Sequence, residues 1–174
     1  MPFYHGSKDA NIIELTTKHS KDGFVYSTSN RLVALTYAAR SFPNLFSSEN
    51  GKEVFNEIKP NLFRKMVEGK SGYIYTLENK EFESVPQSYK CGHTNCFRFN
   101  KDVKVIKKEY IKDFYKEFEK YIKNGEFIVK SYESFSEEKR KKMCKNIALF
   151  AKTLPDCEIN NKNNFWYLFL DDSN

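Results

Sequence analysis

The sequence lacks any apolar run that approaches the roughly 20 residues a helix needs to cross a bilayer. Its beginning also lacks the basic and then apolar pattern of a signal peptide. Cysteine is scarce, because Cys91, Cys96, Cys144 and Cys157 are the only four among 174 residues. So few thiols do not suggest a disulfide framework. We therefore expect a cytoplasmic protein with reduced thiols and no membrane partner.

Several familiar enzyme signatures are missing as well. The sequence has no glycine-rich phosphate loop, no Gly-x-Ser-x-Gly elbow and no His-Glu-x-x-His zinc motif. The segment CGHTNC places Cys91, His93 and Cys96 close together, but a structural zinc site usually has four ligands with paired spacing. Because no convincing fourth ligand accompanies them, we expect no metal site and interpret these cysteines as buried or loop thiols.

The chain is rich in hydrophobic and aromatic side chains, at 40% and 16% of its residues. Sixteen Phe and eleven Tyr provide large side chains for a packed interior and exclude a disordered chain. A length of 174 residues fits one domain with a single core. We expect a single domain over residues 1–174.

The net charge is +6, and the basic excess lies in the C-terminal half. A basic surface can bind nucleic acid or an acidic protein partner. A Lys-rich and Asn-rich composition is also typical of a simply solvated surface. The composition leaves both interpretations open.

Residue patterns predict strands in the first part of the chain. GFVYSTS is a short β-branched run, and NRLVALTYAAR after it has Ser29 or Asn30 available as a helix cap. SGYIYTLEN predicts a second strand, opened by Gly72. FRFNKDVKVI predicts a third, with a turn at Asn100. The polar patches SSENGKE and EINNKNN are interpreted as loops.

Helical patterns follow. Apolar residues of IKKEYIKDFYKEFEKYIKNG recur on one helix face from Ile111 to Ile122, and Gly125 is a stop signal. SFSEEKRKKMCKNIALFAKTL predicts a helix with Ser134 and Glu137 at capping-box spacing. The tail NFWYLFL predicts a closing strand. Strands early and helices late favour an α+β fold.

Three short features could carry chemistry. In FYHGS, Gly6 would let a ligand approach the main chain, while His5 and Ser7 supply polar groups. Tyr26 ends a predicted strand and Tyr37 follows eleven residues later in the predicted helix, so two rings could converge on one cleft. Tyrosine faces suit a flat, partly cationic heteroaromatic ring. Individually, a surface histidine beside a turn glycine and two core tyrosines would explain the same residues.

Together these features resemble the ADP-ribosyltransferase superfamily, whose members split NAD with a His, a Tyr and an acidic residue on three strands. YHGS is similar to the first motif, and VYST followed by the helix with Tyr37 is similar to the second, with the tyrosine spacing of the poly-ADP-ribose polymerase type. The order of elements through SGYIYTLENKEFESVP also resembles small bacterial rifampicin ADP-ribosyltransferases. The resemblance covers residues 3–106 and implies a split β-sheet core with flanking helices. Residues 107–174 would form a helical extension with a closing strand.

The resemblance also implies roles for individual residues. His5 would bond the adenosine ribose, the Gly6 main chain would hold the nicotinamide amide with support from Ser7, and Tyr26 and Tyr37 would line the nicotinamide. Thr28 joins this NAD-binding set.

For the third motif, Glu83 in KEFES is the best acidic candidate, and Glu81 is the next. The catalytic set would then be His5, Tyr26 and Glu83. If CFRFNKDVKV is the third strand instead, the acidic position falls near Asn95 or Cys96, where the sequence has no carboxylate.

The expected function is an NAD-dependent mono-ADP-ribosyltransferase, a toxin or effector, that uses NAD as co-substrate. Its acceptor would be a protein, a nucleic acid or a small molecule. The alternative is a catalytically degenerate module that binds NAD or ADP-ribose without turnover. RNA 2'-phosphotransfer, a third reaction of the superfamily, needs a basic set around the phosphate that the N-terminal segment does not show.

Overall fold

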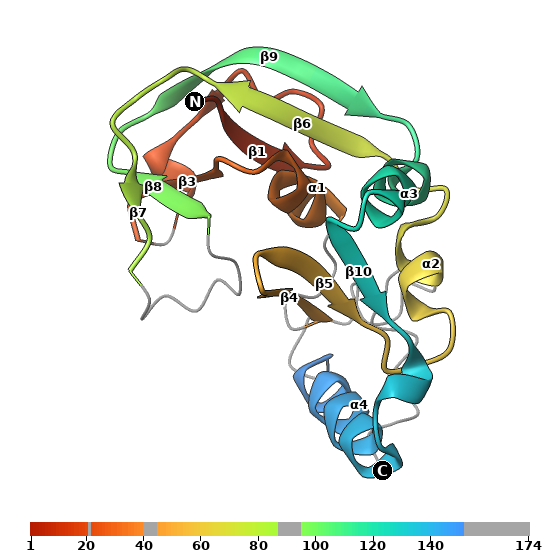
Figure 1. The fold of residues 1–174 in the computed structure, drawn as a ribbon. Helices are drawn as coiled ribbons and strands as arrows, with labels where there is room; N and C mark the ends of the chain where they lie inside the picture. Colours follow the sequence, from red (N-terminus) through yellow and green to blue (C-terminus); the bar gives the residue numbers. More distant parts are fainter. Residues whose placement is uncertain (21, 40–44, 87–94, 152–174) are drawn as a thin grey trace.

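The computed structural model describes residues 1–20, 22–39, 45–86 and 95–151 (Figure 1). The strands are β1 (Phe3–Ser7), β2 (Glu14–Leu15), β3 (Val25–Thr28), β4 (Phe46–Glu49), β5 (Lys52–Asn56), β6 (Gly72–Leu77), β7 (Glu83–Ser84), β8 (Cys96–Phe99), β9 (Val103–Ile111) and β10 (Phe127–Lys130). The α-helices are α1 (Arg31–Ala39), α2 (Leu62–Val67), α3 (Phe114–Lys123) and α4 (Glu137–Ala151), and two 3-10 helices cover Thr17–His19 and Tyr132–Ser134. The described chain is therefore mixed α/β, with four α-helices and mostly antiparallel sheets.

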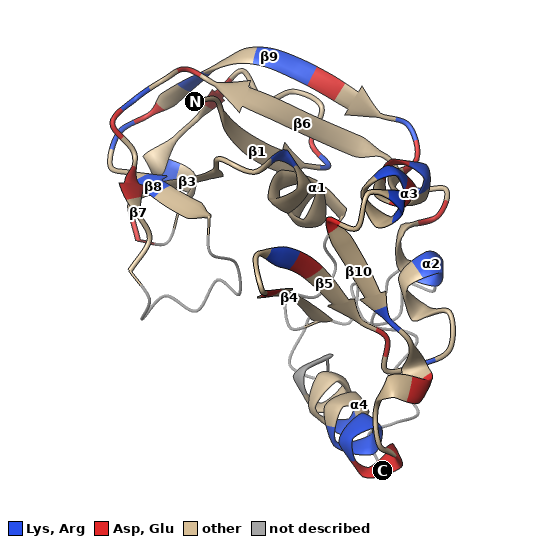
Figure 2. Cartoon of the chain, in the orientation of Figure 1, with Lys and Arg blue, Asp and Glu red and all other residues tan. Residues whose placement is uncertain are grey.

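The larger sheet has seven strands in the order β2-β9-β6-β1-β3-β8-β7, and every neighbouring pair is antiparallel. Charged residues lie along β9, whereas β1 and β6 have none (Figure 2). This difference agrees with their places, since β9 is close to one edge and β1 and β6 lie inside the sheet.

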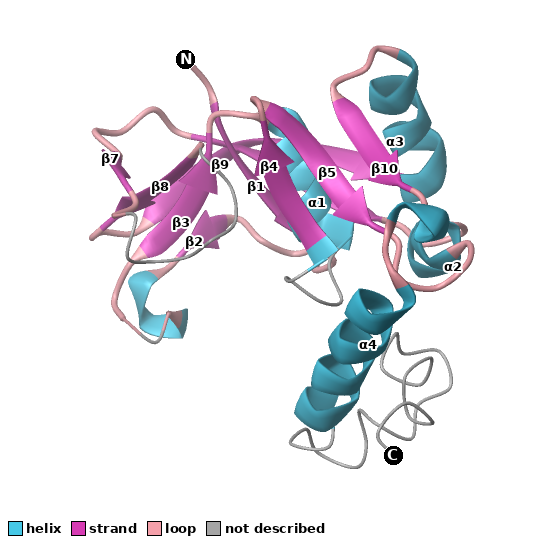
Figure 3. Cartoon of the chain, turned by 60° about the horizontal axis from the view of Figure 1, so that its bottom comes forward, coloured by secondary structure: helices cyan, strands magenta, loops and turns pink. Residues whose placement is uncertain are grey.

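The smaller sheet has the order β10-β5-β4, in which β10 runs parallel to β5 (Figure 3). Helix α1 lies between this sheet and β1 of the larger one (Figure 1). The main core joins Leu35 of α1 with Phe55, Phe118 and Phe127, all of them at most 1% exposed. Packed phenylalanine rings thus tie the smaller sheet to α1 and α3.

Arg31 fixes the start of α1 to two other elements. Its Nη2 donates to Glu109 of β9 at 2.6 Å, and its Nη1 donates to Glu117 and Tyr121 of α3 at 2.9 and 2.6 Å. A guanidinium presents several donors in one plane, so a single side chain can hold both neighbours. This anchor sets the position of the whole helix along β1.

The structure confirms the strand and helix expected from GFVYSTS and NRLVALTYAAR, and the strand that Gly72 opens. Of the two predicted caps for α1, Asn30 acts: its Oδ1 accepts a hydrogen bond from the Leu32 N–H at 2.9 Å. The turn at Asn100 is also present, although β8 and β9 do not pair with each other there.

The helix predicted from Ile106 onward begins later than expected. Residues up to Ile111 belong to β9 and pair with β6, and α3 begins at Phe114. The Asp113 carboxylate accepts from the N–H groups of Tyr115 and Lys116, which makes it the N-cap and starts the helix there. The predicted stop at Gly125, where φ is +71°, is confirmed.

The loop expected over SSENGKE is a β-hairpin instead. Strands β4 and β5 pair around Asn50 and Gly51, whose φ angles are +50° and +76°. Two successive residues with positive φ define the tight turn that Asn-Gly favours between antiparallel strands. The Asn-Gly pair was the signal that the loop interpretation missed.

The C-terminal part is not purely helical, because β9 extends to Ile111 and β10 follows α3. Helix α4 confirms the prediction for SFSEEKRKKMCKNIALFAKTL, but Ser136, whose Oγ accepts from the Lys139 N–H, caps it in place of Ser134. The predicted closing strand NFWYLFL and the predicted loop EINNKNN lie outside the described residues. In the described part, no helix is long and apolar enough to cross a bilayer.

Candidate functional site

The larger sheet is nearly divided between β1 and β3. These two strands share a single residue pair, Tyr4 with Thr28. By contrast, β1 pairs with β6 over five residues and β3 pairs with β8 over four. Figure 1 shows β9, β6 and β1 along the top and β3, β8 and β7 to the left. After Tyr4, β1 therefore continues, but β3 no longer pairs with it.

His5 bridges the two halves at this division. Its Nδ1 lies 3.2 Å from the Tyr26 carbonyl oxygen. A carbonyl oxygen only accepts, so Nδ1 carries the proton and Nε2 of the neutral ring remains an acceptor. Burial lowers the pKa of His5 below its ordinary 6.5, and the hydrogen bond to Tyr26 offsets part of that decrease. The ring is therefore neutral at physiological pH and can accept a hydrogen bond from a hydroxyl.

A cavity of about 310 Å³ opens beside this bridge. Its volume is at the lower end of the range for small-molecule sites, roughly 300–1,000 Å³. The lining residues are Tyr4, His5, Gly6, Tyr26, Ser27, Thr28, Tyr37 and Cys96. The structure thus brings together the predicted NAD-binding residues His5, Gly6, Tyr26, Thr28 and Tyr37.

Hydrogen bonds at the hydroxyl groups orient the two predicted stacking rings. The Tyr26 hydroxyl donates to the Asp22 carboxylate, and hydrogen bonds from Ser20 and Tyr26 lower the pKa of Asp22 below 3.8. The Tyr37 hydroxyl lies 3.5 Å from the Cys96 sulfur. Both rings are therefore held by their polar ends, which leaves their apolar bodies to line the cavity.

Gly6 has a structural role that the sequence did not predict. A Cβ atom built on Gly6 would lie 1.8 Å from the Ala34 carbonyl oxygen and 2.7 Å from the Ala38 nitrogen, both in α1. The missing side chain therefore makes room for the helix backbone, and not only for a ligand. This close approach is what brings Tyr37 of α1 to the cavity.

Two residues of the predicted site, Ser7 and Thr28, accept hydrogen bonds from nearby main-chain N–H groups. The Ser7 Oγ accepts from the Asp9 N–H at 3.1 Å, and Ser7 is not among the lining residues. The Thr28 Oγ1 accepts from the Asn30 N–H at 3.0 Å while Thr28 also lines the cavity.

Ser27, which sequence analysis did not single out, lines the cavity with an Oγ that is buried and has no hydrogen-bond partner in the described part of the chain. A buried hydroxyl in this state favours a ligand or water that bonds it.

The third predicted motif, the acidic residue, does not lie at the cavity with the other two motifs. Strand β8 is the neighbour of β3, and its first residue, Cys96, pairs with Thr28 and lines the cavity. Cys96 is 7% exposed. Among the residues that the structure describes, no carboxylate lines the cavity. The two segments considered for the third strand were KEFES and CFRFNKDVKV. The strand beside β3 is β8, which belongs to the second segment and begins at Cys96.

Glu83 lies one strand further out, on β7. Its carboxylate accepts from Arg98 Nε at 2.6 Å, and its side chain is 58% exposed. The Arg98 guanidinium also lies 4.2 Å from the centre of the Phe24 ring. Glu81 precedes β7 and is exposed. The structure therefore brings neither candidate carboxylate to the cavity.

A second cavity of about 320 Å³ adjoins the first, and the two share His5 and Tyr26. Asp9, Glu14 and His19 are among its other lining residues. Two small cavities that meet at one histidine and one tyrosine could receive the two ends of a molecule with two linked ring systems.

Neither a protein-family model, nor a curated protein, nor a solved structure matches this chain. Over the described ranges, no three His, Cys, Asp or Glu side chains are grouped so that they could hold a metal ion. Cys91 and His93 of CGHTNC lie outside those ranges.

Gly6→Ala should destabilise the protein strongly, because the added methyl group meets helix backbone that cannot turn away. Overpacking of this kind costs about 1–3 kcal/mol or more. Gly69→Ala is the control, since Gly69 has a φ of +68° but nothing within 4 Å of an added Cβ. Urea unfolding should show a clearly larger loss of stability for Gly6→Ala. Equal losses would contradict the close contact between α1 and β1.

His5 should give stability a pH dependence of defined sign. The pKa of His5 in the folded protein is below 6.5, its ordinary value in the unfolded chain. At a pH between these two pKa values, the unfolded chain binds the proton more readily than the folded protein. The neutral ring therefore contributes fully above pH 6.5, and the contribution is lost as the pH falls toward the folded pKa. By NMR, the imidazole should titrate below 6.5. In urea unfolding, wild type should lose stability relative to His5→Gln between about pH 7 and about pH 5. A titration midpoint above 6.5 would contradict a buried neutral ring.

Proposed function

We propose that the cavity between β1, β3 and α1 binds the nicotinamide end of NAD, and that the protein is an NAD-dependent mono-ADP-ribosyltransferase. The observation that supports this proposal is the meeting of His5, Gly6, Tyr26, Thr28 and Tyr37 around one cavity at the division of the sheet. These residues come from two strands and a helix. The resemblance to the ADP-ribosyltransferase superfamily assigns the same residues to NAD.

The lining chemistry suits nicotinamide. A flat ring that is cationic in NAD can lie against the faces of Tyr26 and Tyr37 through stacking and cation–π attraction. Its amide needs both a donor and an acceptor, and we assign it to the main chain at Gly6, which lines the cavity where β3 no longer pairs with β1. The unpartnered Ser27 hydroxyl is a further polar group at the same place.

The neighbouring cavity can take the remainder of the dinucleotide. Its shared wall includes His5, whose Nε2 is an acceptor for a ribose hydroxyl. In this arrangement His5 and Tyr26 lie at the junction between the nicotinamide and the rest of NAD.

Cleavage of the bond between nicotinamide and ribose develops oxocarbenium-like positive charge on the sugar. A fixed carboxylate near the ribose would stabilise this charge, and loss of such a preorganised group costs on the order of 10²–10³-fold in rate. The cavity has Cys96 at the corresponding strand start, and its described lining residues include no carboxylate. We therefore expect transfer by this protein to be slow.

The same observation favours a second candidate, an NAD-binding or ADP-ribose-binding module without turnover. Glu83 is engaged with Arg98 on β7 and stands apart from the cavity. A protein with this geometry could bind the nucleotide without cleaving it. A partner could then contact the bound nucleotide or the protein surface around it. Binding and product formation must therefore be measured separately.

Calorimetric titration with NAD tests the binding claim. Wild type should bind, and Tyr37→Ala should bind about 3-fold to 30-fold more weakly, because one aromatic face contributes roughly 0.5–2 kcal/mol. Tyr110→Ala is the matched control, since Tyr110 is 56% exposed on β9 and lies outside the cavity. Incubation with labelled NAD then separates the candidates: nicotinamide release supports the enzyme, and tight binding without release supports the module. Absence of NAD binding by folded wild type would eliminate both.

Cys96→Glu tests whether the missing carboxylate limits turnover. If the start of β8 faces the nicotinamide ribose, a carboxylate there should raise nicotinamide release by about tenfold or more, while Cys96→Ser should not. NAD titration and thermal unfolding show that each variant is folded and loaded. An unchanged rate in a loaded Cys96→Glu protein would mean that this position does not face the reacting sugar.

A further inference from the structure

A broad basic groove lies at the other end of the molecule. Its volume is about 800 Å³, and α4, the 3-10 helix Tyr132–Ser134 and the segment after β5 form its walls. Among the described residues, its charged lining consists of Lys59, Arg140, Lys141, Lys142, Lys145 and the carboxylate of Glu137. Figure 2 shows this concentration of basic residues on α4, at the bottom of the view.

Within the described ranges, ion pairs neutralise only part of this charge. Glu137 pairs with Lys141 at 2.7 Å, and Glu133 lies near enough for Arg140 to contribute to the lowered pKa of Glu133, after that group's hydrogen bonds to its own backbone and to Ser131. The four lining cations of α4, Arg140, Lys141, Lys142 and Lys145, and these two carboxylates leave a net charge of +2 among the described residues. Lys142 and Lys145 are exposed and, within the described ranges, take part in no ion pair. Residues three apart lie on the same side of a helix, so both ammonium groups face the groove together.

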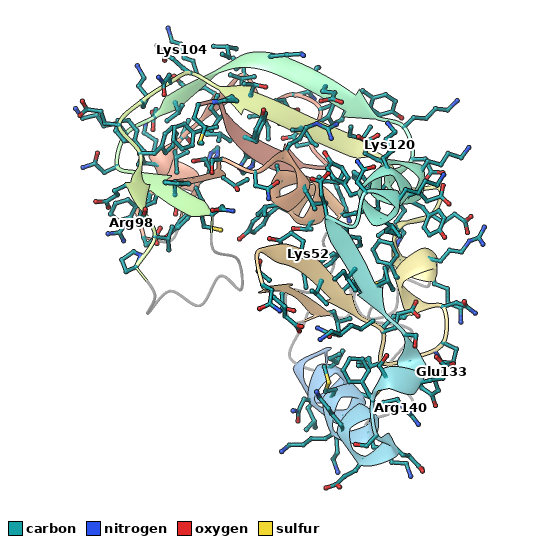
Figure 4. The ribbon with its side chains drawn as sticks, viewed as in Figure 1. Lys52, Arg98, Lys104, Lys120, Glu133 and Arg140 are labelled. Carbon is teal, nitrogen blue, oxygen red and sulfur yellow. The ribbon has the colours of Figure 1, made fainter. Side chains whose placement is uncertain are left out.

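Arg140 is held in place without a carboxylate. Its Nη1 donates to the carbonyl oxygens of Tyr132 and Phe135, at 3.1 and 2.6 Å. Its guanidinium lies over the Tyr132 ring, 4.0 Å from the centroid. Figure 4 labels Arg140 close to Glu133, in the lower part of the view. Its other N–H donors have no hydrogen-bond partner in the described part of the chain. A fixed guanidinium plane can bond phosphate oxygens or stack on a nucleobase.

The groove is not purely polar, because the exposed Pro60 and the half-buried Tyr132 ring also line it, together with Ile58 and Cys144, which are buried. An acidic peptide would use the cations and gain little from this apolar part. In a duplex the base faces are stacked inside, whereas an unpaired strand can lay a base or sugar on an apolar surface while its phosphates meet the lysines. The combination therefore fits single-stranded nucleic acid best.

We propose that this groove binds the phosphodiester backbone of single-stranded RNA or DNA, with Lys142 and Lys145 on the phosphates and Arg140 on a phosphate or base. This inference uses none of the cavity residues, so it does not depend on the proposed reaction with NAD. Lysine contacts to phosphates release counterions, which makes binding sequence-tolerant and sensitive to salt.

Fluorescence anisotropy with a labelled oligouridylate of about 12 nucleotides tests the proposal. For three phosphate contacts, the logarithm of the association constant should fall with the logarithm of the salt concentration with a slope of about −2. Lys142→Glu should weaken binding about tenfold and make the slope less steep. Lys123→Glu, the same charge change at the end of α3 and outside the groove, should leave binding within about twofold of wild type. Far-UV circular dichroism establishes that both variants are folded.

Three outcomes would overturn the proposal. Equal loss of affinity in Lys142→Glu and Lys123→Glu would show that only the net charge matters. Equal or tighter binding of a polyglutamate peptide of the same length would assign the groove to an acidic protein. Equal or tighter binding of a duplex, or no binding of the oligouridylate at low salt, would remove the single strand as the ligand.

Discussion

The contact between helix α1 and strand β1 at Gly6 is the constraint on which the arrangement of the cavity depends. The Ala34 carbonyl lies so close that no side chain fits at position 6. At the other end of the constraint, Arg31 ties the first turn of α1 to Glu109 and Glu117. Because the helix is fixed at both places, Tyr37 has one position relative to β1 and β3. A helix shifted outward by one methyl group would move that ring away from the cavity.

The division of the sheet supplies the other wall. Strands β1 and β3 share one residue pair and then no longer pair, and residues of both strands line the cavity beside this division. His5 compensates for part of the lost pairing, because its Nδ1 donates to the Tyr26 carbonyl across the gap. The same hydrogen bond fixes the tautomer and presents Nε2 as an acceptor. One side chain thus stabilises the division and prepares it for a hydroxyl-bearing ligand.

Sequence patterns predicted the local elements of the site well. A β-branched run followed by Asn30 was enough to place β3 before α1, and His5, Gly6 and the two tyrosines meet as expected, whereas Ser7 does not line the cavity. What local patterns do not determine is which strand lies beside β3, since that choice depends on pairing between distant segments. The structure selects β8, and so Cys96 lines the cavity where Glu83 was expected to act.

The remaining errors have similar causes. Residues Ile106 to Ile111 lead directly into the apolar face expected from Ile111 onward, and so short a window does not separate a helix from a strand. Pairing with β6 decides for the strand. The Asn50–Gly51 turn was polar enough to suggest a loop, although it is the turn of a hairpin. The basic excess of the C-terminal half was visible in the sequence, but only the fold gathers part of it around one groove.

A crystal structure determined with NAD at saturating concentration tests the central claim most directly. The account predicts the nicotinamide ring between Tyr26 and Tyr37, its amide on the main chain at Gly6, and a ribose hydroxyl on His5 Nε2. Nicotinamide bound elsewhere, or an empty cavity in a crystal where NAD occupies another surface, would contradict the account.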